Sequence, residues 1–216
     1  MVFMSTSACK NLEKYRNAHG IPGPLPNPVT ETNNKVQLLL QTHPASDFPS
    51  VLPPHVTACG PILRPCGSIR QENSELAAWL WRGPTVLINM GSLVTLGQAT
   101  TRQFAEAIRM LLDTRRDIQV LWKLQRDGQT GPDNSLECIK AEITAGIVRI
   151  EEWLPVEPIC ILLSGHVKCV VHHGGSNSYH EAIRYVITLC HMPIKILIDP
   201  QSWNPANCPS RLVRYL

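Results

Sequence analysis

The sequence predicts an α/β fold in which helices flank a parallel sheet. Short apolar, β-branched segments alternate with amphipathic helical segments between residues 72 and 184, a pattern typical of strand–helix–strand units with parallel strands. Two of the strand segments run directly into small-residue loops that open a helix, as strands do at the carboxyl edge of such a sheet. The chain has 216 residues, 44% of them hydrophobic, and is long enough to bury a core.

The first elements of this fold are a short helix and a buried strand. The helix is expected to run from Asn73 or Ser74, either of which can cap it, to Trp81. Gly83-Pro84 then ends it. The β-branched, apolar run 85–90 that follows is typical of a strand buried on both faces.

A long helix and a second strand come next. Thr95 is the expected N-cap of the helix, because Gln98 three residues later completes the pattern of a capping box. Residues 118–124 read as the second strand. The apolar stripe of the helix is supplied by four residues at helical spacing, namely Phe104, Ile108, Leu111 and Leu112.

The remaining elements repeat this alternation up to residue 184. We expect them, in order, as a helix over 135–143, a strand over 147–150, a helix over 158–164, a strand over 167–171 and a helix beginning near Ser178. Before residue 66 the pattern is absent. Ten of the 18 prolines lie between Pro22 and Pro65, so this part is expected to be extended, irregular chain.

Composition excludes several classes of function. The net charge of +3, from 20 basic and 17 acidic residues, is too small to indicate a nucleic-acid partner. The eight cysteines include no C-x-x-C pair, which argues against structural zinc and against a disulfide scaffold. We see no secretory signal and no apolar segment long enough to span a bilayer, and we therefore expect a cytoplasmic protein.

Candidate chemistry lies in the two loops that follow strands, residues 90–92 and 172–178. Glycines allow backbone to approach a phosphate, and unpaired amides at a helix N-terminus point at it. The neutral hydroxyl and amide donors of these loops would add hydrogen bonds without negative charge. The alternative is that both loops are tight turns and nothing more. The donors are Ser92, Ser176, Asn177 and Ser178.

Three further side chains have both a functional and a structural interpretation. Trp153, after a strand, can stack a nucleobase or can pack in the core. Glu181 faces the same side of its helix as Asn177 and can accept from ribose hydroxyls or face solvent. His173 can donate to a phosphate or sugar oxygen or can cap its turn. A metal site formed by His173 with Cys169, His172 and His180 is disfavoured. His172 and His173 follow each other at the end of a strand, and successive strand residues point to opposite faces.

Together these residues resemble the signature box of the family 1 UDP-glycosyltransferases. The preceding strand and loop, residues 86–92, resemble the Gly-Ser loop of the same family. The amino-acid sequence of the box is most similar to that of fungal members. The resemblance covers roughly residues 58–184. Its box consists of Trp153-x-Pro155, then Leu162, then His173-x-Gly175-x-Asn177-Ser178-x-x-Glu181.

The resemblance implies one half of a GT-B architecture, in which two Rossmann-like domains face each other across a cleft. Residues 1–60 would be a remnant of the acceptor domain, 61–83 a linker with a short helix, 84–184 the Rossmann-like UDP-sugar-binding domain and 185–216 a divergent tail. It also implies site roles. Trp153 would stack the uracil and Glu181 would bind the ribose. The diphosphate would be held by Ser92, His173, Asn177 and Ser178, with Gly175 completing the donor-binding set.

The chain departs from the family pattern at both ends, so we expect the fold to be incomplete there. After Arg184 the family's Gly-Val-Pro turn is missing, and Asp199 and Gln201 correspond poorly to its sugar-binding acidic motif. An altered reading frame, a splice variant or a pseudogene-like product would explain this change. The family's catalytic His–Asp pair has no counterpart before Lys10, so no catalytic residue is assigned.

The expected function is transfer of a hexose from a UDP-sugar to a small lipophilic or phenolic acceptor. The resemblance implies inversion at the sugar carbon, no metal and no cofactor besides the donor substrate. Activity of this chain alone is expected to be weak or absent, because a missing general base costs about 10²–10⁴-fold in rate. The alternative is a pseudoenzyme or complementing module that binds UDP or a UDP-sugar without catalysis.

Overall fold

A computed structural model describes residues 7–23, 37–43, 51–128, 133–184 and 187–191. The chain divides into two compact units, residues 1–60 and 61–216, which are described separately. Among the described helices, none has the length and apolar character needed to cross a membrane.

The first unit contains the helix α1 (Ser7–Ala18) and two short parallel strands, β1 (Leu38–Leu40) and β2 (Val56–Ala58). The expectation of largely irregular chain missed these elements. Local contacts rather than an apolar stripe accompany the helix end: the Tyr15 and His19 rings stack with centroids 4.0 Å apart, and Arg16 Nη2 donates to the Pro22 carbonyl oxygen at 3.1 Å. Hydrophobic periodicity could not reveal contacts of this kind.

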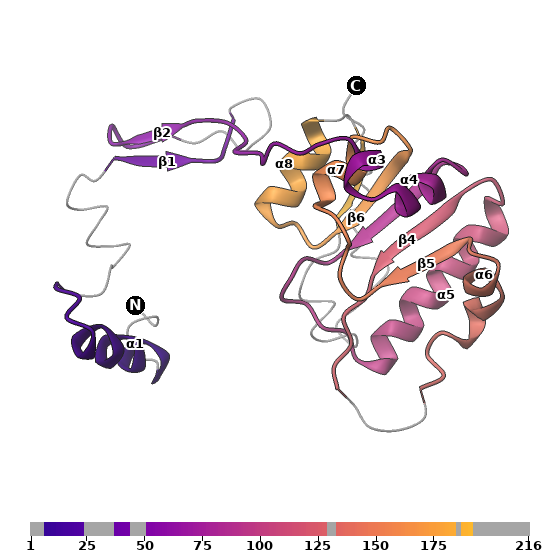
Figure 1. Ribbon diagram of the computed structural model, residues 1–216, viewed down its shortest axis with the longest axis horizontal. Coiled ribbons are helices and arrows are strands. Elements are labelled where there is room, and N and C mark those ends of the chain that lie inside the picture. Colours follow the sequence, from indigo (N-terminus) through magenta and orange to yellow (C-terminus); the bar gives the residue numbers. More distant parts are fainter. Residues whose placement is uncertain (1–6, 24–36, 44–50, 129–132, 185–186, 192–216) are drawn as a thin grey trace. The chain divides into compact units, whose positions relative to one another are not determined.

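The second unit is built on a five-stranded parallel sheet (Figure 1). The strands lie in the order β5-β4-β3-β6-β7, so the order reverses between β3 and β6. At such a reversal the connections leave toward opposite faces of the sheet and open a crevice at the carboxyl ends of the strands. The strands are β3 (Thr85–Asn89), β4 (Gln119–Lys123), β5 (Val148–Glu151), β6 (Val167–His172) and β7 (Thr188–His191).

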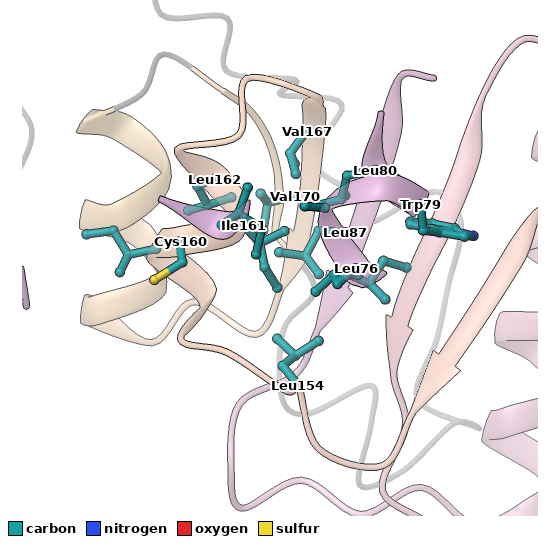
Figure 2. Close-up of a cluster of buried hydrophobic side chains, with 14 of the residues drawn as sticks. Leu76, Trp79, Leu80, Leu87, Leu154, Cys160, Ile161, Leu162, Val167 and Val170 are labelled. Atoms are coloured by element: carbon teal, nitrogen blue, oxygen red, sulfur yellow. The ribbon is translucent and has the colours of Figure 1, made fainter. Parts of the chain in front are cut away.

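Helices cover both faces of this sheet, and alternation along the strands divides the core in two. Leu87 and Leu121 pack against the helices α3 (Ile69–Glu72), α4 (Ser74–Leu80), α7 (Pro158–Leu162) and α8 (Ser176–Arg184). Figure 2 shows Leu76, Leu80 and Leu87 of this cluster beside Ile161 and Leu162. Trp122 packs on the opposite face against α5 (Gln98–Thr114), the 3₁₀ turn η1 (Glu137–Ile139) and α6 (Lys140–Thr144). The predicted α/β fold is confirmed.

The start of α4 matches the prediction, whereas the start of α5 does not. The Asn73 side chain accepts a hydrogen bond from the Leu76 amide at 2.8 Å and is the N-cap of α4. Thr95 is not the cap of α5, which begins at Gln98 with Gly97 as N-cap. The reason is a distant contact: the Leu96 amide donates to the Gln125 carbonyl at 2.8 Å, and this bond holds the chain extended past the predicted start.

Other boundaries also differ from the prediction. The predicted helix over 135–143 is the turn η1 followed by the short helix α6, and α8 begins at Ser176, two residues before the expected start. The strand β7 lies in the segment expected to be a divergent tail, and it pairs with β6 from Cys169↔Thr188 to His172↔His191. Asp199 and Gln201 lie outside the described residues.

Candidate functional site

A pocket of about 630 Å³ lies at the carboxyl ends of β3, β4 and β5, beside the start of α8. This is the edge at which the reversal of strand order opens the sheet. Its wall has five parts. Asn89, Gly91 and Ser92 come from the end of β3 and its loop, Lys123 from β4, residues 153–158 from the chain after β5, and Asn177, Ser178 and Glu181 from α8. Glu72 completes it.

The loop after β3 is shaped by a glycine with a left-handed backbone. Gly91 has φ of 84°, a conformation that favours glycine, and its amide donates to Asn89 Oδ1 at 3.0 Å. This local turn directs Ser92 into the pocket wall. The loop is therefore more than a generic turn, because its backbone and side chain both face the same cavity.

The two small-residue loops meet around the ring of His173. A Cβ atom built on Gly91 would lie 2.6 Å from His173 Cε1, and one built on Gly175 would lie 2.7 Å from His173 Nε2. The ring thus fits between two glycines because neither has a side chain. His173 and Gly175 are not among the residues that line the pocket, although the His173 ring lies against Gly91, which does line it.

Trp153 and Lys123 contact each other in the wall of the pocket. Trp153 is 59% exposed, which excludes the core-packing alternative. Lys123 Nζ lies 3.7 Å from the centroid of the Trp153 ring and donates to the Gly91 carbonyl oxygen at 2.7 Å. Sequence reasoning missed Lys123. The available signal was that it is the one charged residue in the strand segment 118–124.

Glu181 lies one helical turn after Asn177, and both line the pocket. Its side chain is partly buried, and burial, with the nearby Glu157 carboxylate as a second cause, raises the pKa of Glu181 from its usual 4.5 to about 6. A carboxylate with a raised pKa in a cavity is a frequent feature of functional sites. The alternative of a solvent-facing glutamate does not fit this environment.

Five of the seven predicted site residues line this one pocket, and they come from three segments of the sequence: Ser92, Trp153, Asn177, Ser178 and Glu181. Their individual roles stay predictions. The Cys169, His172, His173 and His180 side chains do not form a metal-binding group: within the described ranges, no three His, Cys, Asp or Glu residues are placed to hold an ion.

Curated relatives identify the family. A glycosyltransferase of Sordaria araneosa, sdnJ, is 42% identical over 176 residues, which is 79% of this chain and 34% of the relative. Human UDP-glucuronosyltransferases 2B17 and 2B15 are each 24% identical over 174 residues, or 78% of this chain and 29% of theirs. The chain belongs to the family 1 UDP-glycosyltransferases. It spans about a third of the length of the curated relatives it matches. No family model matches it.

Solved structures show the same fold and place this UDP-glycosyltransferase chain within part of a GT-B architecture. A UDP-glucosyltransferase from Polygonum tinctorium matches with a TM-score of 0.53 and 20% identity over 72% of this chain and 34% of that one. The glycotransferase of kitacinnamycin matches with a TM-score of 0.51 and 16% identity over 85% of this chain and 42% of that one.

Proposed function

We propose that this UDP-glycosyltransferase chain binds the donor, a UDP-sugar, in the pocket at the carboxyl edge of its sheet. The observation that carries the proposal is the meeting of Ser92, Trp153 and Glu181 in one cavity with Asn177 and Ser178. These residues lie up to 89 positions apart in the sequence. A stacking ring, a carboxylate and neutral donors are the set that a nucleoside diphosphate requires.

Each group has a chemical task in this proposal. The exposed Trp153 ring stacks the uracil, since aromatic platforms bind bases through their faces. Glu181 accepts from the two ribose hydroxyls when ionised. Ser92, Asn177 and Ser178 donate to the diphosphate beside the start of α8, where the helix dipole favours negative charge.

The complete enzyme transfers a hexose to a small lipophilic or phenolic acceptor with inversion. The acceptor oxygen forms a bond to the anomeric carbon as the bond to UDP breaks, and the electron pair leaves with UDP. The helix N-terminus and neutral donors offset the charge that develops on the departing diphosphate, without need of a metal. The acceptor proton passes to a base supplied by another part of the enzyme.

Binding without transfer is the second candidate function. It is favoured by one observation: in the described part of the chain, no histidine lines the pocket. A nucleotide could thus be held here while the proton acceptor for transfer is absent. Turnover assays with UDP-sugar and acceptor, run after nucleotide binding is measured, separate the two candidates.

The binding step is tested by thermal melts of the chain with and without UDP. A ligand at 100 times its dissociation constant adds about 2.7 kcal/mol of stability, which raises Tm by roughly 5–10 °C for a domain of this size. Trp153→Ala should lose most of the shift, because stacking contributes about 1–3 kcal/mol. The matched control is Trp81→Ala: Trp81 is 60% exposed, as Trp153 is 59% exposed, but it lies outside the pocket. Equal shifts in the two variants would contradict the proposal.

Glu181 predicts a pH dependence of UDP affinity. Because the pKa of the free chain's Glu181 is raised to about 6, the carboxylate that accepts from ribose is lost below this pH, and affinity should fall by up to tenfold per pH unit. The folded-state pKa lies above the unfolded value, so without ligand the free energy of unfolding should decrease as pH rises from about 4.5 to 6. Calorimetric titrations at several pH values test this, and Glu181→Gln should flatten both profiles. An affinity that stays constant between pH 5 and 7 would be inconsistent with it.

A further inference from the structure

Lys123 is a buried cation at the wall of the pocket. It is the last residue of β4 and is 7% exposed. Alternation along the strand puts it on the same face of the sheet as Leu121, the face covered by α4, α7 and α8. A lysine is rarely this buried unless its charge is paired, so its partners are informative.

The carboxylate in register with Lys123 is already engaged. Lys123 aligns with Glu151 of β5, but Arg149 Nε donates to Glu151 Oε1 at 2.6 Å, and Arg149 also pairs with Glu75 at 2.9 Å. The contacts of Lys123 itself are the Gly91 carbonyl oxygen and the Trp153 ring. Among the described residues, no carboxylate forms an ion pair with it.

A carbonyl and an aromatic ring stabilise an ammonium group but do not neutralise it. Both interactions are electrostatically favourable, yet removing an ammonium from water is costly without a counter-charge. Burial accordingly lowers the pKa of Lys123. An ammonium has three N–H donors, and these two contacts leave capacity for a third acceptor.

The charges of the pocket indicate what that acceptor is. Three carboxylates line the pocket, those of Glu72, Glu157 and Glu181. Within the described residues, Lys123 is the sole cationic side chain in the lining. A nucleoside diphosphate entering this cavity would therefore meet repulsion from the acidic side chains and attraction from one ammonium group.

We propose that Lys123 is the counter-ion of the nucleotide's diphosphate. Its ammonium donates to a phosphate oxygen while the Gly91 carbonyl and the Trp153 ring hold it in place. The inference rests on the proposed function. The side chain of Lys123 contacts both Gly91, in the loop of the phosphate subsite, and the Trp153 ring of the base subsite. Its charge, however, acts on the diphosphate, so loss of the charge should affect phosphate-bearing ligands far more than the nucleoside.

Calorimetric titration of the full chain with UDP and with uridine tests this assignment. Lys123→Met removes the charge and keeps the length of the side chain, whereas Lys123→Gln keeps a donor for the Gly91 carbonyl. Both should weaken UDP binding by about 10- to 100-fold, the effect of one hydrogen bond to a charged group, and change uridine binding less than threefold. Rising salt should weaken UDP binding to the wild type more steeply than to either variant.

The matched control is Lys168→Met. Lys168 lies on β6, is exposed, and donates to the Gly165 carbonyl oxygen at 2.7 Å, the distance of the Lys123–Gly91 bond, but it does not line the pocket. It should bind UDP as the wild type does. Equal losses for UDP and uridine in both Lys123 variants, or no loss for UDP, would overturn the inference while leaving the pocket a UDP site. Failure of the wild type to bind UDP would instead overturn the proposed function and this inference with it.

Discussion

Trp122→Ala is expected to lower the free energy of unfolding by about 3–5 kcal/mol, the usual cost of removing a buried tryptophan. Trp122 is fully buried, and its ring stacks on Phe104 with centroids 5.6 Å apart. The side chain fills the core between the sheet and α5, where close packing leaves little room for collapse around a cavity. Because a domain is stable by only about 5–15 kcal/mol in total, urea titration should show a large drop in the denaturation midpoint.

Trp122→Phe gives the matched control and has a different expected size. The indole nitrogen Nε1 of Trp122 is buried and has no hydrogen-bond partner among the described residues, a condition that costs about 1–3 kcal/mol. Phenylalanine keeps much of the ring contact with Phe104 and removes that unpaired donor, so its net cost should stay below about 1.5 kcal/mol. If phenylalanine destabilises the chain as much as alanine does, packing is not the main contribution of Trp122.

Gly91→Ala should damage both the fold and the site. A left-handed backbone costs a residue with a side chain about 1–2 kcal/mol, and Gly91 has φ of 84°. The added Cβ would also lie 2.6 Å from His173 Cε1, and relieving such overpacking typically costs about 1–3 kcal/mol. We expect a loss of about 2–4 kcal/mol in the free energy of unfolding and at least a tenfold weaker affinity for UDP, measured by urea titration and calorimetry.

Two variants separate the causes of this effect. Gly128→Ala should leave stability and affinity unchanged, because a Cβ at Gly128 has no neighbour within 4 Å. Adding His173→Ala to Gly91→Ala should recover part of the lost stability, because the smaller side chain removes the clash and leaves only the backbone strain. The displaced ring is not the cause if the double variant is less stable by the full sum of the two single effects.

The parts of the fold that local chemistry determines were predictable. The run Thr85–Asn89 is largely apolar and β-branched, as buried strands are, and the Asn73 side chain can cap a helix with no help from distant residues. The apolar stripe that begins at Phe104 likewise predicted which face of α5 is buried. Such features depend on spacing along the chain, which the sequence contains.

Features that depend on distant contacts were not predictable. The helix α5 begins at Gln98 rather than after Thr95 because Leu96 bonds to Gln125 across the sheet edge. The strand β7 forms by pairing with β6, and no turn signal precedes it. Neither contact leaves a trace in the hydrophobic pattern of its own segment.

The candidate site shows the same division. Trp153 and Glu181 could be found because the spacing of the family box contains them. Lys123 was missed, because a lysine at the end of a strand is normally exposed and solvated, and its standing as the one charged residue of 118–124 does not by itself indicate a site. Only the strand order, with β4 beside β3, brings its ammonium to Gly91 and Trp153.

The central position of β3 has a consequence for how the protein is made. Thr85 of β3 pairs with Gln119 on one side and with Val167 on the other, so the second partner leaves the ribosome about 80 residues after β3 does. At roughly 5–20 residues per second, one edge of the middle strand waits about 4–16 s for its neighbour. An unpaired strand edge is a template for wrong pairing. Translation speed between β4 and β6 therefore controls how long the nascent chain is vulnerable to aggregation.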